Sequence, residues 1–177
     1  MTTRYFYDTE FVEDGRTIEL VSLGIVDESG EREYYAVSAE FDAAGAGAWV
    51  RRNVLDKLPG PAAPVWKSRQ AIRDELTAFL TAGDEPELWA WMGAYDHVVL
   101  CQLYGAMPDL PKALPRFTHE LRQRWEDLGS PPLPAAPQDA HDAMADARHN
   151  LARWRALEAT RPDRDRWRTL EAAPRPG

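Results

Sequence analysis

Two carboxylates that are two residues apart, Asp8 and Glu10, lie at the end of a short aromatic and apolar run near the N-terminus. This run, residues 4–9, predicts a strand, and side chains two residues apart in a strand point to the same face. Two adjacent carboxylates repel each other unless a cation lies between them, and oxygen ligands of this kind suit Mg²⁺ or Mn²⁺. An acidic pair is also common at a solvated strand end, so the pair alone leaves both interpretations open.

A third carboxylate, Asp96, follows a predicted strand (residues 87–91) and opens a predicted helix (residues 95–104). An acidic residue in the first turn often does no more than cap the helix and complement its dipole. If the strand before it lies beside the first strand, however, Asp96 would reach the same pocket as Asp8 and Glu10.

His141 and Asp146 lie five residues apart, where a helix over residues 142–159 is predicted. On one continuous helix this spacing would separate the two side chains by about 140°, so they could not share a site. Asp142 is a good N-cap, however, and prolines precede it at positions 131, 132, 134 and 137. We therefore expect His141 on the incoming loop, turned towards a site that Asp146 faces. The alternative is a surface histidine beside a capped helix.

In order and context, these segments resemble the DEDDh exonuclease family of the ribonuclease H-like superfamily. That family has Asp-x-Glu on its first strand, an Asp that opens a helix, and a His-x4-Asp motif. The resemblance covers residues 4–155. The phrase Arg-Tyr-Phe-Tyr-Asp-Thr-Glu-Phe and the small size are most similar to compact actinobacterial exoribonucleases related to ribonuclease T and oligoribonuclease. The sister class has Tyr-x3-Asp in its third motif and is excluded, because the residue four before Asp146 is Asp142.

The resemblance implies two divalent ions, Mg²⁺ or Mn²⁺, in a site that releases nucleoside 5′-monophosphates from a 3′ end. Asp8 would bridge both ions, Glu10 and Asp96 would complete one or both shells, and Asp146 would hold the ion on the nucleophile side. Two such ions clamp the attacking and leaving oxygens of an in-line displacement. His141 would be the general base, because an imidazole ordinarily titrates near neutral pH. Glu10 and His141 would also contact the substrate.

Several neighbouring side chains have open roles. Phe11 follows Glu10 directly and would either stack on the terminal base or pack in the core. His97 and His149 are expected to be surface or outer groups rather than metal ligands. Trp89 and Trp91 are expected in the core, and Trp66 in a proline-rich loop that lies near the site. Arginines at positions 148, 153 and 155 would meet phosphates or form a solvated face.

The elements that must position these residues predict an α/β fold. Three antiparallel strands (residues 4–9, 19–27 and 31–37) precede a helix at 46–58 and a helix from the N-cap Ser68 to about Thr81. After the strand at 87–91 and the helix at 95–104, Thr118 is predicted to cap a helix that ends at Leu128. The order suits a ribonuclease H-like mixed sheet, with three antiparallel strands plus parallel strands, flanked by helices.

Length and composition predict one domain over residues 1–160, because 177 residues leave little room for a second core, and the resemblance makes it a DEDDh exonuclease domain. Residues 161–177 are expected to form a C-terminal tail or peripheral arm. The single cysteine, Cys101, excludes an internal disulfide and a zinc site of several cysteines. With neither a signal-peptide layout nor an apolar stretch of membrane-spanning length, we expect a cytoplasmic protein without a membrane partner. The resemblance also implies a homodimer.

The expected substrate is the 3′ end of single-stranded RNA. A net charge of −8 argues against a broad basic surface that coats nucleic acid, but not against an enzyme that grips a few nucleotides. A DNA exonuclease of the same family is the first alternative, because the catalytic residues cannot separate RNA from single-stranded DNA. A non-catalytic nucleic-acid-binding domain is the second, although a binding module has no need of four converging carboxylates.

Overall fold

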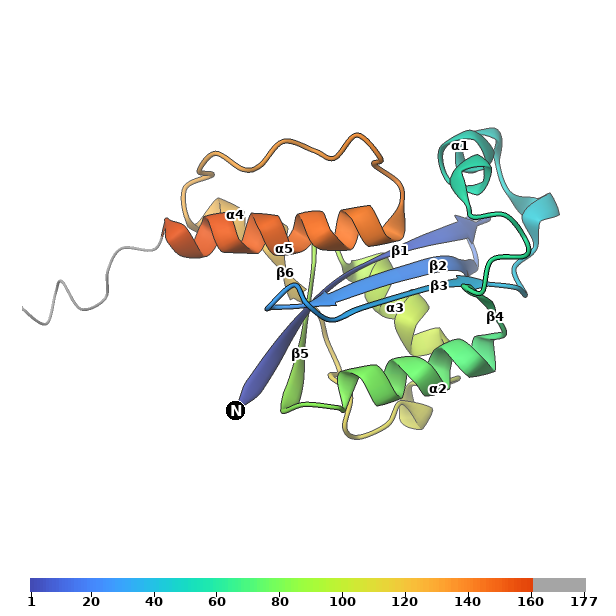
Figure 1. The fold of residues 1–177 in the computed structure, drawn as a ribbon, viewed down its shortest axis with the longest axis horizontal. Coiled ribbons are helices and arrows are strands. Elements are labelled where there is room, and N and C mark those ends of the chain that lie inside the picture. The colour runs from blue at the N-terminus through green and yellow to red at the C-terminus, as the bar shows by residue number, and fades with distance from the viewer. Residues whose placement is uncertain (161–177) are drawn as a thin grey trace, which may run out of the picture.

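The computed structural model describes residues 1–160, so the predicted arm at 161–177 lies outside the described residues (Figure 1). Its centre is a six-stranded mixed sheet in the order β4-β3-β2-β1-β5-β6. The strands are β1 (Thr2–Glu13), β2 (Ile18–Asp27), β3 (Glu33–Ser38), β4 (Trp66–Lys67), β5 (Glu85–Ala90) and β6 (His119–Glu120). The first three pair antiparallel, while β4, β5 and β6 each pair parallel to a neighbour. The mixed sheet predicted from the sequence is thus confirmed.

Helices cover both faces of this sheet (Figure 1). The long α5 (Ala143–Ala159) lies along one face with α4 (Leu121–Asp127) behind it, whereas α2 (Arg69–Leu80) and α3 (Ala94–Gln102) lie on the other. The alternating strand residues divide accordingly. Tyr5 and Tyr7 join the core beneath α2 and α3, and Phe6 joins Met144 and Leu151 beneath α5. Asp8 and Glu10 continue the Phe6 series, so they face the side of the sheet that α5 covers.

The predicted helix over residues 46–58 is wrong in its extent. The segment contains the 3-10 turn η1 (Ala43–Gly45), a short α1 (Ala48–Asn53) and a second 3-10 turn η2 (Leu55–Lys57). Asp42 caps η1, the extended Gly47 is the N-cap of α1, and α1 ends at Asn53, followed by the C-cap Val54 with a φ of −119°. Packing of Val54 against Val12 and Val21 holds this broken path on the sheet.

Thr118 does not cap the helix that follows it, so that prediction is wrong. Residues 119–120 instead form β6 beside Trp89 and Ala90, and the Glu120 side chain caps α4. The Thr118 hydroxyl is bonded to the Tyr7 hydroxyl, at 2.6 Å, and to His97 Nδ1, at 3.0 Å. The Thr118 hydroxyl is therefore hydrogen-bonded to Tyr7 and His97 and does not cap the helix. The sequence also did not predict the edge strand β4, which holds Trp66.

Candidate active site

Asp8 and Glu10 lie within β1 rather than at its end, because β1 continues to Glu13. The parallel pairing of β1 with β5 stops at Phe6 opposite Trp89, whereas the antiparallel pairing with β2 continues past both carboxylates. The stretch from Asp8 to Glu10 therefore has a strand on one side only. On its other side the chain leaves β5 and enters α3, which brings Asp96 to the same place.

Asp96 is bonded directly to the residue between the two carboxylates of β1. Its Oδ1 accepts hydrogen bonds from the backbone N–H of Thr9, at 2.8 Å, and from the Thr9 hydroxyl, at 2.7 Å. Asp96 belongs to the first turn of α3 and is only 6% exposed. The predicted meeting of this carboxylate with the Asp8–Glu10 pair is thus present. The positioning role of Thr9 was missed, although Thr9 stands between the two carboxylates in the sequence.

His141 occupies the loop before α5, as predicted, with a backbone φ of +68°. Its backbone N–H donates to Oδ2 of Asp146 at 2.8 Å, and Asp142 caps the helix by accepting from the N–H of Ala145 at 2.9 Å. Because His141 lies on a turn before the helix, it can lie beside Asp146 although the two residues are five positions apart. Within residues 1–160, Glu10, His141 and Asp146 each offer a ligand atom, and these three atoms all lie within 4.8 Å of one another.

Asp146 lies at the site because the first turn of α5 packs closely against the sheet. Gly24 pairs with Asp8 across β1 and β2, and a Cβ at Gly24 would lie 2.3 Å from the carbonyl oxygen of Ala143. Only glycine allows the first turn of α5 to lie this close to the strands. Farther along α5, the buried Asn150 amide donates to the carbonyl oxygen of Tyr7 at 3.0 Å.

Burial and mutual repulsion raise the pKa values of the clustered carboxylates. Burial, followed by repulsion from Asp96 and Glu10, raises the pKa of Asp8 well above its usual range. Burial and repulsion from Asp146 raise the pKa of Glu10 to about 8. Burial also raises the pKa of Asp96, against the opposing effect of its two hydrogen bonds from Thr9. Without a cation, this cluster opposes its own ionisation.

The other basic residues near the motifs have structural partners. Arg148 pairs with Glu33, and Arg155 donates to the carbonyl oxygens of Glu28 and Ser29. These two arginines bind α5 to the β2–β3 hairpin. Arg153 differs, because its positive charge lowers the pKa of Asp8 while its guanidinium lies 4.4 Å from the Trp91 ring centre.

The two other histidines of the motif regions lie outside the cluster. His97 contacts Thr118 and the carbonyl oxygen of Arg116, and His149 is buried in α5. Trp66 is also occupied elsewhere, since its ring stacks with Phe41 and its Nε1 donates to the carbonyl oxygens of Pro59 and Gly60.

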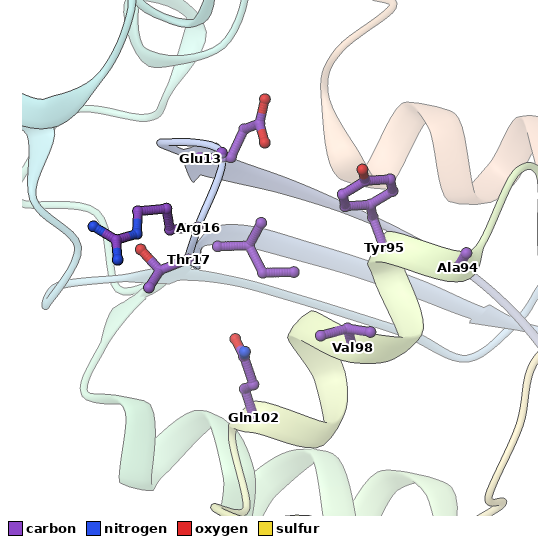
Figure 2. Close-up of a pocket in the computed structure, with 9 residues that line it drawn as sticks. Glu13, Arg16, Thr17, Ala94, Tyr95, Val98 and Gln102 are labelled. Carbon is purple, nitrogen blue, oxygen red and sulfur yellow. The ribbon is translucent and has the colours of Figure 1, made fainter.

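A groove of about 420 Å³ lies between the β1–β2 hairpin and α3 (Figure 2). Tyr95 and Val98 line the groove from α3, and these two residues are 57% and 46% exposed. Arg16 lines it from the hairpin. Phe11 stacks on Tyr95 with ring centres 5.7 Å apart and packs partly against the core.

The donor set fits hard divalent cations. Glu10, His141 and Asp146 bring their ligand atoms within 4.8 Å of one another, and Asp8 and Asp96 lie close enough for their charges to repel the other carboxylates. Oxygen-rich sites of this kind select Mg²⁺ or Mn²⁺. The raised pKa values of Asp8 and Glu10 give a second reason, because cations would relieve the repulsion that causes part of them.

Comparison with known proteins identifies the family. A family model described as the 3′-5′ exoribonuclease Rv2179c-like domain matches residues 3–157. This chain belongs to that family. Two curated relatives of this Rv2179c-like chain come from Mycobacterium tuberculosis strains CDC 1551 / Oshkosh and ATCC 25618 / H37Rv. Each is 61% identical over 159 residues, which cover 89% of this chain and 94% of the relative, and both are named 3′-5′ exoribonucleases.

Solved exonuclease structures share the fold of the Rv2179c-like chain. The zinc-bound E. coli ExoI–ssDNA complex superposes with a TM-score of 0.66 at 13% identity, over 96% of this chain and 43% of that one. The nuclease domain of 3′hExo, a DEDDh family member bound to rAMP, gives 0.50 at 13% identity, over 89% and 92%. These two likenesses confirm the ribonuclease H-like fold predicted from the sequence. The family match and the relatives at 61% identity confirm the predicted resemblance to exonucleases, and the chain is a hydrolase of the exonuclease class.

Proposed function

We propose that the domain at residues 1–160 is a metal-dependent 3′-5′ exoribonuclease that removes nucleoside 5′-monophosphates from unpaired RNA ends. The observation that carries this proposal is the meeting of Glu10, His141 and Asp146 within 4.8 Å, beside Asp8 and Asp96. The activity named for the relatives at 61% identity supports RNA as the substrate. The homodimer and the cytoplasmic setting stay predictions. In residues 1–160 no helix has the length and apolar character to cross a membrane.

Asp8, Glu10, Asp96 and Asp146 would hold two divalent ions, Mg²⁺ or Mn²⁺. When bound, such ions offset the charge on the phosphate and lower the pKa of attacking water. Asp8 and Glu10 supply oxygens from one face of β1. Asp96 supplies oxygens that Thr9 orients by two hydrogen bonds. Asp146 also supplies an oxygen, and its Oδ2 accepts a hydrogen bond from the backbone N–H of His141.

His141 would act as the general base that takes a proton from the attacking water. A general base must lie within hydrogen-bond reach of that proton, and the imidazole is among the atoms gathered at Glu10 and Asp146. Glu10, Phe11 and His141 would contact the substrate. The exposed Tyr95 ring, on which Phe11 stacks, gives an adjoining surface for an unpaired base.

The test is a time course with Mn²⁺ on four 5′-labelled substrates: single-stranded RNA, DNA of the same sequence, a hairpin RNA and a 3′-phosphorylated RNA. We expect a ladder that shortens from the 3′ end and is fastest on unpaired RNA, because a paired terminal base must be unstacked before it enters the site. Internal cuts would show an endonuclease and contradict the proposal. Faster digestion of the DNA would assign the same chemistry to a DNA exonuclease. Asp8→Ala is the inactive control.

A further inference from the structure

His141 has a main-chain conformation that is uncommon for any residue other than glycine. Its φ of +68° lies in the left-handed region, and a residue held there depends on its surroundings to keep it in place. One restraint is internal, since the His141 N–H is bonded to Asp146. That bond fixes the backbone and leaves the ring direction to other contacts.

Those other contacts come from one segment that lies far away in the sequence, residues 48–57, which hold α1 and η2. Lys57 Nζ donates to the carbonyl oxygen of Ala140, the residue before His141, at 2.5 Å. The Trp49 ring lies with its centre 4.8 Å from that of the His141 ring, at an interplanar angle of 81°. The first contact holds the peptide that leads into His141, and the second limits the positions of the imidazole.

The 48–57 segment is itself fixed. Val54 is 2% exposed and packs with Val12 and Val21 of the sheet. The Arg51 guanidinium donates to the carbonyl oxygens of Ala43, Ala44 and Ala46, which holds α1 to the turn before it. Trp49, by contrast, is 52% exposed, and among residues 1–160 its one aromatic ring contact is with His141. An indole left half in water on a fixed support is better explained by its contact with the imidazole than by core packing.

We propose that Trp49 and Lys57 are positioning residues, which hold the loop and imidazole of His141 in place for proton transfer without contacting the reacting atoms. This inference rests on the proposed function, in which His141 is the base. Proton transfer needs the base within hydrogen-bond reach, and a misplacement of about 1 Å can cost roughly 100-fold in rate. Neither residue belongs to the three motifs, so their role follows from the structure alone.

The first test is steady-state kinetics on a short 5′-labelled RNA. Trp49→Ala is expected to lower kcat by roughly 10- to 100-fold while KM and Mn²⁺ affinity stay unchanged. Trp49→Phe, which keeps a ring, should recover most of the rate, and Lys57→Met should lower kcat in the same way. The matched control is Phe117→Ala. Phe117 is 60% exposed and makes a similar edge contact with His119, at 4.8 Å and 67°. Lys112→Met is the control for Lys57.

The second test is a double-mutant cycle with His141→Ala. If Trp49 acts through the imidazole, Trp49→Ala should cost nothing further in the His141→Ala background, because interacting residues are not additive. A full additional loss there, or a raised KM with unchanged kcat, would overturn the inference and make Trp49 an RNA contact. Full wild-type kcat for Trp49→Ala would overturn it too. If His141→Ala itself keeps wild-type activity, the proposed base has failed instead.

Discussion

The Oδ1 atom of Asp96 accepts two hydrogen bonds from Thr9, one from the backbone and one from the side chain. The carboxylate of the second motif is thereby fixed to the strand that carries the first. Groups that orient a metal ligand typically affect metal affinity or activity by about 10- to 100-fold when they are removed. We therefore expect Thr9→Val to weaken Mn²⁺ binding by about that factor, because it removes the hydroxyl and keeps the shape. Calorimetric titration measures this, and Thr9→Ser should retain near-normal affinity. Equal affinity in all three proteins would contradict the role of the hydroxyl.

Each of the four carboxylates is expected to be essential. Asp8→Ala, Glu10→Ala, Asp96→Ala and Asp146→Ala should each abolish hydrolysis while the circular dichroism spectrum stays native. Above about pH 8, where Glu10 is ionised in the folded protein, removal of its charge relieves repulsion among the rest, so we expect Glu10→Ala to melt at a higher temperature than wild type in EDTA at that pH. The control is Asp127→Ala, an exposed carboxylate on α4, which should leave hydrolysis unchanged. Near-normal activity in any one of the four would remove that residue from the site.

The metal-free protein should lose stability as pH rises. Burial and repulsion from Asp146 raise the pKa of Glu10 from about 4.5 to about 8 in the folded state. A carboxyl with a raised folded pKa contributes stability that is fully present below its unfolded pKa and lost as pH rises through its folded pKa. The melting temperature measured in EDTA should therefore decrease as pH rises from about 4.5 to about 8. Glu10→Gln should flatten this dependence, and Mn²⁺ should stabilise the wild type increasingly as pH rises. A melting temperature in EDTA that rises across this range would refute the prediction.

His141→Ala should separate catalysis from metal binding. Positioned proton transfer contributes about 10²- to 10⁴-fold, so turnover should fall by that order while Mn²⁺ affinity stays largely intact. The imidazole lies among ligand atoms of Glu10 and Asp146, which makes the distinction necessary. Calorimetric titration of both proteins with Mn²⁺ decides it. A collapse of affinity in His141→Ala would make His141 a ligand rather than a base.

Gly24→Ala tests the close approach of α5. The new Cβ would lie 2.3 Å from Ala143 O and 2.5 Å from Met144 Cα, so the helix must move away from the strands. Overpacking of this kind costs about 1–3 kcal/mol or more, and displacement of α5 carries Asp146 with it. We expect a lower free energy of unfolding in urea and weaker Mn²⁺ binding. Gly60→Ala is the control, since its Cβ would meet nothing within 4 Å. Wild-type stability of Gly24→Ala would show that the contact is not required.

The sequence by itself determined the identity of the candidate residues. Acidic pairs in strands, an acidic residue after a strand and a capped helix are local patterns, and local patterns depend on backbone periodicity and capping. Those patterns singled out Asp8, Glu10, Asp96 and His141 as candidates, and the resemblance to the DEDDh family assigned their roles, which stay predictions. The antiparallel order of the first three strands followed in the same way from short turns between apolar runs.

The tertiary structure alone decided which distant groups surround those residues. Thr118 was assigned to a cap and instead bonds to Tyr7 and His97, because a hydroxyl goes to whichever partner the packing brings near. The contacts of Trp49 and Lys57 with the histidine loop join positions that are 92 and 83 residues apart, and no local pattern encodes such a pair. The left-handed φ of His141 was likewise not predicted, because positive φ is uncommon outside glycine and no local pattern indicated it here. Residue type and spacing thus indicated which side chains could carry the chemistry, whereas long-range packing set their positions and contacts.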